Sequence, residues 1–126
     1  MLSMNELPCP VLVTDMCGTM LALNLPLREL VGASHVDVEA QSMDVLFPPA
    51  SRIFLQTHAW PTLLRDGRVT EIHLHLIDTR GQRIPVMVNA QPGVWNGKPA
   101  CFWVLFVAQE RDCANNSIYL SVLTRN

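Results

Sequence analysis

Alternation of apolar and polar residues in the second half of the chain limits the possible folds more than any other feature. In Thr70–Ile77 every second residue is apolar, and Arg83–Ala90 repeats the pattern. Successive side chains of a strand point to opposite faces, so each segment is predicted to be a strand with one buried face. A turn at Asp78–Gly81 separates them, and Asn96–Gly97 predicts a tight hairpin before a final strand, Cys101–Val107. The pattern therefore predicts three consecutive antiparallel strands.

The first half of the chain adds two short strands and a helical middle. Cys9–Asn24 has the composition of two strands around the turn Asp15–Gly18. Pro26–Gly32 begins with a proline and ends with a glycine, as helices do. Ser42–Phe47 is predicted to be one helical turn with a serine cap, and a longer helix follows over Ala50–Arg65. This order predicts an α+β fold, a five-stranded antiparallel sheet with its helices on one face.

The space between the long helix and the sheet is the first candidate site. At about 100° per residue, Ile53, Thr57, Trp60 and Leu64 share one stripe, which we expect to face the sheet. Pro61 lacks an N–H, so the Thr57 carbonyl loses its usual partner and the helix is expected to kink. The sheet is expected to oppose this stripe with Ile72, Leu74, Leu76, Ile84, Val86 and Val88. Such a lining suits either an apolar ligand or a packed core, and both readings remain open.

Composition narrows the class of protein. The 126 residues suffice for one domain, and 49% are hydrophobic against 16% charged, which indicates that another chain or domain covers part of the surface. A net charge of −2 argues against a nucleic-acid partner. The apolar stretches are too short or too polar to span a membrane, and Met1–Leu7 does not resemble a signal peptide. Cys9, Cys17, Cys101 and Cys113 form no CxxC pair, so reduced thiols in a cytoplasmic protein are expected.

Several segments, in this order, resemble the PAS sensory domains. The segments are Pro8–Asp15 with Gly18 and Asn24, Glu29–Gly32, Arg52–His58 with Pro61 and Leu63, Asp78–Gly81 followed by Ile84–Val86, and Ala108–Asp112. The match covers residues 7–112. It leaves 1–6 as an N-terminal extension and 113–126 as a tail, a non-native end or the start of a linker. Arg52–His58 is similar to a bacterial subgroup whose members usually precede diguanylate cyclase, histidine kinase or serine phosphatase domains.

The resemblance implies a cytoplasmic, non-catalytic sensor or dimerisation module of a bacterial signalling protein. In such modules a small apolar ligand or a partner regulates an attached effector domain. The ligand pocket predicted here consists of residues on the long helix and on the two strands after it: Phe54, Thr57, His58, Trp60, Leu64, Ile72, Leu74, Val86 and Val88.

Three kinds of chemistry compete with simple ligand binding. Some PAS domains bind haem through a helix histidine, so His58 makes a haem-based gas sensor the alternative function, with a structural histidine as the other reading. A cysteinyl-flavin adduct is excluded, because no cysteine lies between Met20 and Gly97. His73 and His75 share a strand face, where a polar sheet surface is expected rather than a metal site. No nucleophile motif, phosphate loop or carboxylate pair is present, so a small stand-alone enzyme is the least favoured alternative.

The last strand, apolar on both faces, predicts a homodimer. If Phe102, Val104 and Phe106 turn inward, the other set turns outward and leaves apolar side chains on the outer sheet face. The predicted dimer interface is Met87, Cys101, Trp103, Leu105 and Val107. The alternative is that Leu2–Leu7 covers this face.

Overall fold

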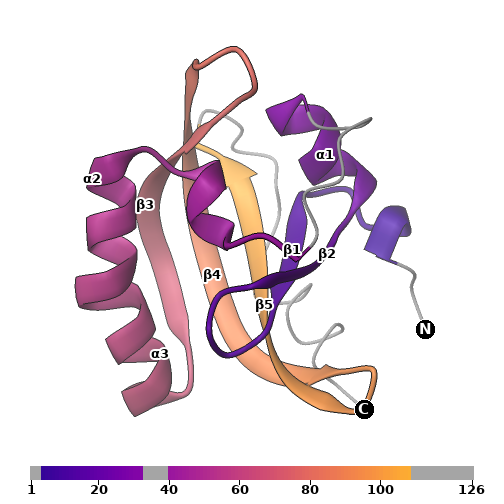
Figure 1. The fold of residues 1–126 in the computed structure, drawn as a ribbon, viewed down its shortest axis with the longest axis vertical. Coiled ribbons are helices and arrows are strands. Elements are labelled where there is room, and N and C mark those ends of the chain that lie inside the picture. The colour runs from indigo at the N-terminus through magenta and orange to yellow at the C-terminus, as the bar shows by residue number, and fades with distance from the viewer. Residues whose placement is uncertain (1–3, 33–39, 109–126) are drawn as a thin grey trace.

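A computed structural model describes residues 4–32 and 40–108 as one antiparallel sheet with a layer of helices (Figure 1). The strand order across the sheet is β2-β1-β5-β4-β3. The strands are β1 Val11–Thr14, β2 Met20–Leu23, β3 Val69–Ile77, β4 Arg83–Trp95 and β5 Lys98–Val107. The predicted α+β class and the five-stranded antiparallel sheet are confirmed. The central strand, β5, and its neighbour β1 come from opposite ends of the described chain.

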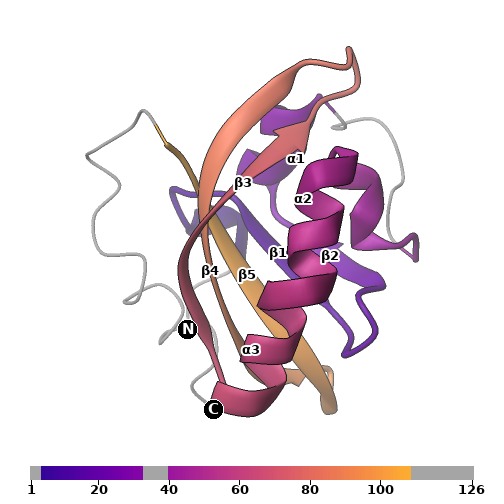
Figure 2. The same cartoon turned by 90° about the vertical axis from the view of Figure 1, so that its left-hand side faces the viewer.

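The helices are short and lie mainly over one face of the sheet (Figure 2). They are α1 Leu25–Val31, α2 Pro49–Phe54 and α3 Trp60–Asp66, with a π-helical segment, Leu55–Ala59, that joins α2 to α3. Two 3-10 turns, Met4–Glu6 and Met43–Leu46, complete the set. The Ser42 cap is confirmed, because its side chain accepts a bond from the Asp44 N–H. Among the described residues no helix is long and apolar enough to cross a membrane.

Asn24 ties the N-terminal strands to α1. Its buried side chain accepts bonds from the N–H groups of Val11 (2.9 Å) and Leu27 (3.2 Å), and the second of these caps α1. Its amide donates to the carbonyls of Met4 and Cys9, both at 2.9 Å. The side chain of one residue thus bonds backbone groups of the N-terminal segment, β1 and α1 at the same time.

The β4–β5 hairpin is longer than the sequence pattern indicated. Asn96 and Gly97 have φ of 51° and 79°, the geometry of the predicted two-residue turn, and Trp95 pairs with Lys98 across it. Pro92 lies inside β4 although proline cannot donate to a neighbouring strand. It is tolerated because the pairing of β3 with β4 stops at Ala90, so β4 has only β5 beside it there.

Both edges of the sheet carry additional contacts. On the β2 edge, Met20 exchanges backbone bonds of 2.8 Å with Ala40 and Gln41. On the β3 edge, the hydroxyl of Ser51 accepts the N–H of His75 at 3.0 Å. A bulge in β3 puts Glu71 at a φ of 54°, which further breaks the regular edge. These features limit pairing of an edge strand with another chain.

Candidate functional site

The interior between the helices and the sheet is filled by side chains. The inward orientation predicted for Ile72, Leu74, Val86 and Val88 is confirmed, since all four belong to the main buried cluster. The helices oppose them with Leu55, Ala59 and Leu63, each at most 1% exposed. The residues that we expected to line a ligand pocket from the strands are therefore core residues in this structure.

The helix presents the opposite face to the one predicted. Ile53 is 61% exposed and Leu64 is 67% exposed, and Thr57 also faces solvent. The face toward the sheet instead follows a spacing of four residues through Leu55, Ala59 and Leu63. Trp60, from the predicted stripe, is half-buried against the core.

The disturbance expected at Pro61 takes the form of the π-helical segment. The N–H of Trp60 donates to the carbonyl of Leu55, five residues back, instead of four. Thr57 uses its hydroxyl to donate to the Ile53 carbonyl at 2.7 Å. The wider turn keeps Leu55 and Ala59 on the sheet side ahead of a proline that cannot continue the regular bond pattern.

His58 is not placed to bind haem inside the domain. It is exposed, and its ring packs against Phe54 with the ring centroids 4.8 Å apart. Phe54 is itself 37% exposed. An axial ligand would have to point between helix and sheet, whereas both of these predicted pocket residues lie away from it. The geometry does not fit the haem alternative.

A buried tryptophan joins the central strand, β5, to β1. The indole N–H of Trp103 donates to the Thr14 hydroxyl at 3.0 Å, and both side chains are at most 1% exposed. Trp60 packs edge-on against the same indole with ring centroids 5.3 Å apart. The predicted outward orientation of Trp103 is therefore wrong.

The same correction applies to the rest of the predicted interface on β5. Cys101 and Leu105 belong to the helix-side core together with Trp103, and Val107 pairs with the inward residue Val86. The hairpin register explains the error. A two-residue turn that pairs Trp95 with Lys98 also pairs Val88 with Leu105, and directly paired residues share a face.

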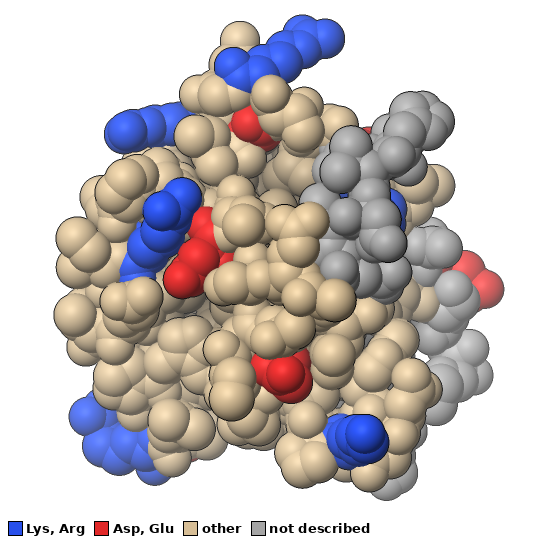
Figure 3. Space-filling model, viewed as in Figure 1, with Lys and Arg blue, Asp and Glu red and all other residues tan. Residues whose placement is uncertain are grey.

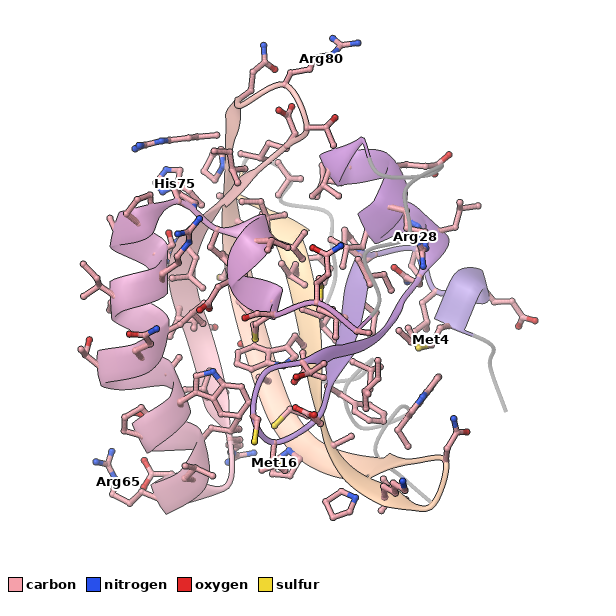
Figure 4. The ribbon with its side chains drawn as sticks, in the orientation of Figure 1. Met4, Met16, Arg28, Arg65, His75 and Arg80 are labelled. Carbon is pink, nitrogen blue, oxygen red and sulfur yellow. The ribbon has the colours of Figure 1, made fainter. Side chains whose placement is uncertain are left out.

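Sulfur atoms gather where β1 turns into β2. The Cys101 thiol lies 3.7 Å from the sulfur of Met16, which Figure 4 shows at the β1–β2 turn. Burial, with a smaller contribution from the charge of Asp15, raises the pKa of the Cys101 thiol to about 12. The raised pKa lowers the thiolate fraction of Cys101 and so its reactivity at neutral pH.

The outer face of the sheet carries a second apolar cluster. Phe102, Val104 and Phe106, which were expected to turn inward, point to this side instead. Met87 lies on this face as expected, but it packs against this cluster and not against the predicted patch on β5. The cluster is completed by residues of β1, the start of β5 and the segment before β1: Leu7, Cys9, Val11, Val13 and Ala100. Leu7 and partly buried Met4 belong to it, which agrees with the alternative that N-terminal residues cover this face.

The other polar side chains of the described residues do not group into a metal site or a charged patch. His73 and His75 are exposed on β3, and within the described ranges no three His, Cys, Asp or Glu residues group to hold a metal ion. Figure 3 shows charged side chains of both signs scattered over one face. One feature that the sequence reasoning missed is a cavity of about 420 Å³ between the β1–β2 and β4–β5 hairpins.

Comparison with known proteins gives matches at the level of the fold and one sequence relative. No protein-family model matches the chain. The chain is 25% identical over 118 residues to the phosphoserine phosphatase RsbP of Bacillus subtilis, which covers 94% of this chain and 29% of that protein. It thus spans less than a third of the length of this relative.

Two solved structures illustrate the structural similarity. A PAS domain from Colwellia psychrerythraea has a TM-score of 0.71 at 15% identity and covers 85% of this chain and 92% of that one. The PAS domain of nitrogen regulation protein NR(II) from Vibrio parahaemolyticus has a TM-score of 0.64 at 16% identity, over 82% and 93%. These matches confirm the resemblance deduced from the sequence, and the chain has the fold of the PAS domains found in bacterial sensory and signalling proteins.

Proposed function

We propose that this chain is a cytoplasmic, non-catalytic regulatory module that controls an attached effector domain through self-association of its outer sheet face. The observation that carries the proposal is the second apolar cluster, which holds Phe102, Val104 and Phe106 on the face away from the helices. These three side chains are at most 3% exposed, so a second copy would contact the partly buried residues around them, Met87 among them. The fold and the partial coverage of a longer phosphatase support a regulatory part in a larger protein.

The position of the cluster suits transmission of a signal. It lies on β1 and β5, the first and last strands of the described chain, which are hydrogen-bonded neighbours in the sheet. A partner bound to the partly buried residues around the cluster acts on both strands through the cluster. Any change in their packing then reaches the end of β5, where the N–H of Ala108 donates to the Pro85 carbonyl at 2.9 Å.

The interior supports a ligand less well than the outer face supports a partner. Leu55, Leu74, Val86 and Trp103 fill the space that an apolar ligand would need. Binding there requires displacement of core side chains, which costs packing energy. Mass spectrometry of the denatured, freshly purified protein tests this directly, since a stoichiometric small molecule would contradict the packed interior.

Light scattering coupled to size exclusion tests the self-association. Wild type is expected to run as a dimer, and Met87→Glu is expected to run as a monomer because it places an unpaired charge on the outer face. Met87 is only partly buried, so far-UV circular dichroism should show the substituted domain still folded. The matched control is Ile53→Glu, the same kind of change on the solvent side of α2, which should leave the dimer intact.

Two results would overturn the proposal. A monomeric wild type at concentrations around 100 μM would remove the self-association, since the affinity would then be too weak to act within a protein. A folded Met87→Glu variant with the dimer mass would show that another face mediates it.

A further inference from the structure

The cavity between the two hairpins lies away from the interior of the domain. Its described lining comes from two elements that are far apart in sequence. The β1–β2 hairpin contributes Asp15 and Leu21, and the β4–β5 hairpin contributes Trp95, Asn96, Lys98 and Pro99.

The unequal lengths of the strands create this cavity. β1 ends at Thr14, which pairs with Cys101, whereas β5 begins three residues earlier at Lys98. The end of the β4–β5 hairpin therefore extends past β1 and leaves a recess beside the β1–β2 turn. Leu21 and Trp95 both pack against the outer apolar cluster, so the recess opens on that side of the sheet.

The recess contains two opposite charges that do not pair with each other. Asp15 and Lys98 form no ion pair within the described part of the chain. The Oδ1 atom of Asp15 accepts the N–H groups of Cys17 and Thr19, both at 2.9 Å, which fixes the carboxylate while its second oxygen accepts no bond from a described residue. A fixed anion and a nearby cation in one recess suit a ligand that carries both complementary charges.

Apart from Asn96, the remaining lining residues are apolar, and one of them is held in place by a ring contact. The indole of Trp95 is held edge-on against Phe102, with ring centroids 6.3 Å apart. Leu21 and Pro99 add aliphatic surface beside it. A flat aromatic wall with aliphatic neighbours favours an aromatic or aliphatic side chain, and an indole also attracts a ligand cation.

We propose that this recess binds a free α-amino acid with an apolar side chain. Its ammonium group contacts Asp15, its carboxylate contacts Lys98, and its side chain packs on Trp95. The volume of about 420 Å³ accommodates a ligand of this size with its open side toward solvent. This inference is independent of the proposed self-association, because it concerns the hairpin ends and needs no second copy of the chain.

Isothermal titration with three related compounds tests the recess. L-phenylalanine carries both charges, 2-phenylethylamine lacks the carboxylate, and 3-phenylpropanoate lacks the ammonium group. L-phenylalanine is expected to bind at least about tenfold more tightly than either analogue, because each analogue loses one charge-assisted contact. In proton NMR spectra the indole N–H of Trp95 should shift on binding, while those of Trp60 and Trp103 serve as internal references.

Two charge-removing variants assign the contacts. Asp15→Asn keeps an oxygen that accepts the same two backbone bonds, so it removes the charge and preserves the turn. This variant should bind L-phenylalanine about tenfold or more weakly, whereas its affinity for 3-phenylpropanoate should not fall. Lys98→Gln should likewise bind L-phenylalanine more weakly, whereas its affinity for 2-phenylethylamine should not change. The control variant Arg65→Gln, at the end of α3 (Figure 4), should bind both compounds as tightly as wild type.

The proposal is refuted by either of two outcomes. One is no heat and no Trp95 shift with L-phenylalanine up to about 10 mM, beyond which specific binding has little meaning. The other is binding that both charge variants leave unchanged.

Discussion

Replacement of Thr14 by valine tests the hydrogen bond that joins β1 to β5. Valine has nearly the shape of threonine but cannot accept the indole N–H of Trp103, which Thr14 accepts at 3.0 Å. Both residues are at most 1% exposed, so water cannot take over the lost bond. A buried donor without a partner costs about 1–3 kcal/mol, and we expect the free energy of unfolding to fall by about 2 kcal/mol.

Urea unfolding followed by far-UV circular dichroism measures this loss. For a domain of this size the same loss lowers the melting temperature by about 4 °C per kcal/mol. Thr70→Val is the matched control, because Thr70 is an exposed threonine on β3 and its replacement should change the stability by less than about 0.5 kcal/mol.

A double-mutant cycle separates the hydrogen bond from packing. Trp103→Phe removes the donor, so in that background Thr14→Val should cost less than about 0.5 kcal/mol. An equal cost of Thr14→Val in both backgrounds would show that the hydroxyl stabilises the fold in some other way. A negligible cost in the wild-type background would refute the reasoning altogether.

Four further results are expected. Leu55→Ala should destabilise the fold by about 2–5 kcal/mol and Ile53→Ala by less than about 0.5 kcal/mol, which reports the true face of the helix in a denaturant titration. Asn24→Ala should lower the melting temperature strongly, by about 8 °C or more, because the backbone groups of Val11, Leu27 and Cys9 each lose a buried hydrogen bond at once. Iodoacetamide at pH 8 should label exposed Cys17 and spare buried Cys101 in intact-mass spectra. The free energy of unfolding should fall as the pH rises from 9.0 toward about 12, because Cys101 ionises at lower pH in the unfolded chain than in the folded one.

The sequence was sufficient to predict which segments form strands and how they connect. Regular alternation in β3 and β4 fixed both the period and the buried face, because only one face of each is apolar. The Asn96–Gly97 turn fixed the hairpin between β4 and β5. In these segments the local sequence was compatible with only one structure, so it was enough to predict that structure.

The predicted buried face was wrong for the helix and for β5, because each has two faces that are similarly apolar. The helix has one stripe through Ile53 and Leu64 and another through Leu55 and Leu63, and periodicity gives the spacing of a stripe but does not choose between two. The stripe that faces the sheet is the one with Leu55, Ala59 and Leu63, and the small side chain of Ala59 is fully buried there. β5 is apolar on both faces, and only its pairing with β4, counted back from the turn, reveals that Trp103 faces the helices.

The candidate binding site was out of reach for a different reason. Asp15 and Lys98 lie near opposite ends of the described chain. They line the same recess because β5 extends from Cys101 back to Lys98, beyond the end of β1 at Thr14. Strand ends are the least predictable part of a sheet from sequence, since they depend on tertiary contacts more than on local composition. A recess formed by unequal strand lengths therefore leaves no motif to recognise.

The neighbouring positions of β1 and β5 also determine when this chain can fold during its synthesis. Thr14 and Trp103 are 89 residues apart, so the middle of the sheet cannot close until almost the whole described chain has left the ribosome. Until then Val11–Thr14 has only β2 as a partner, and an isolated two-stranded hairpin is marginally stable. The nascent chain thus keeps an apolar strand exposed for most of its translation, which makes this stage the one most open to chaperone binding and to aggregation.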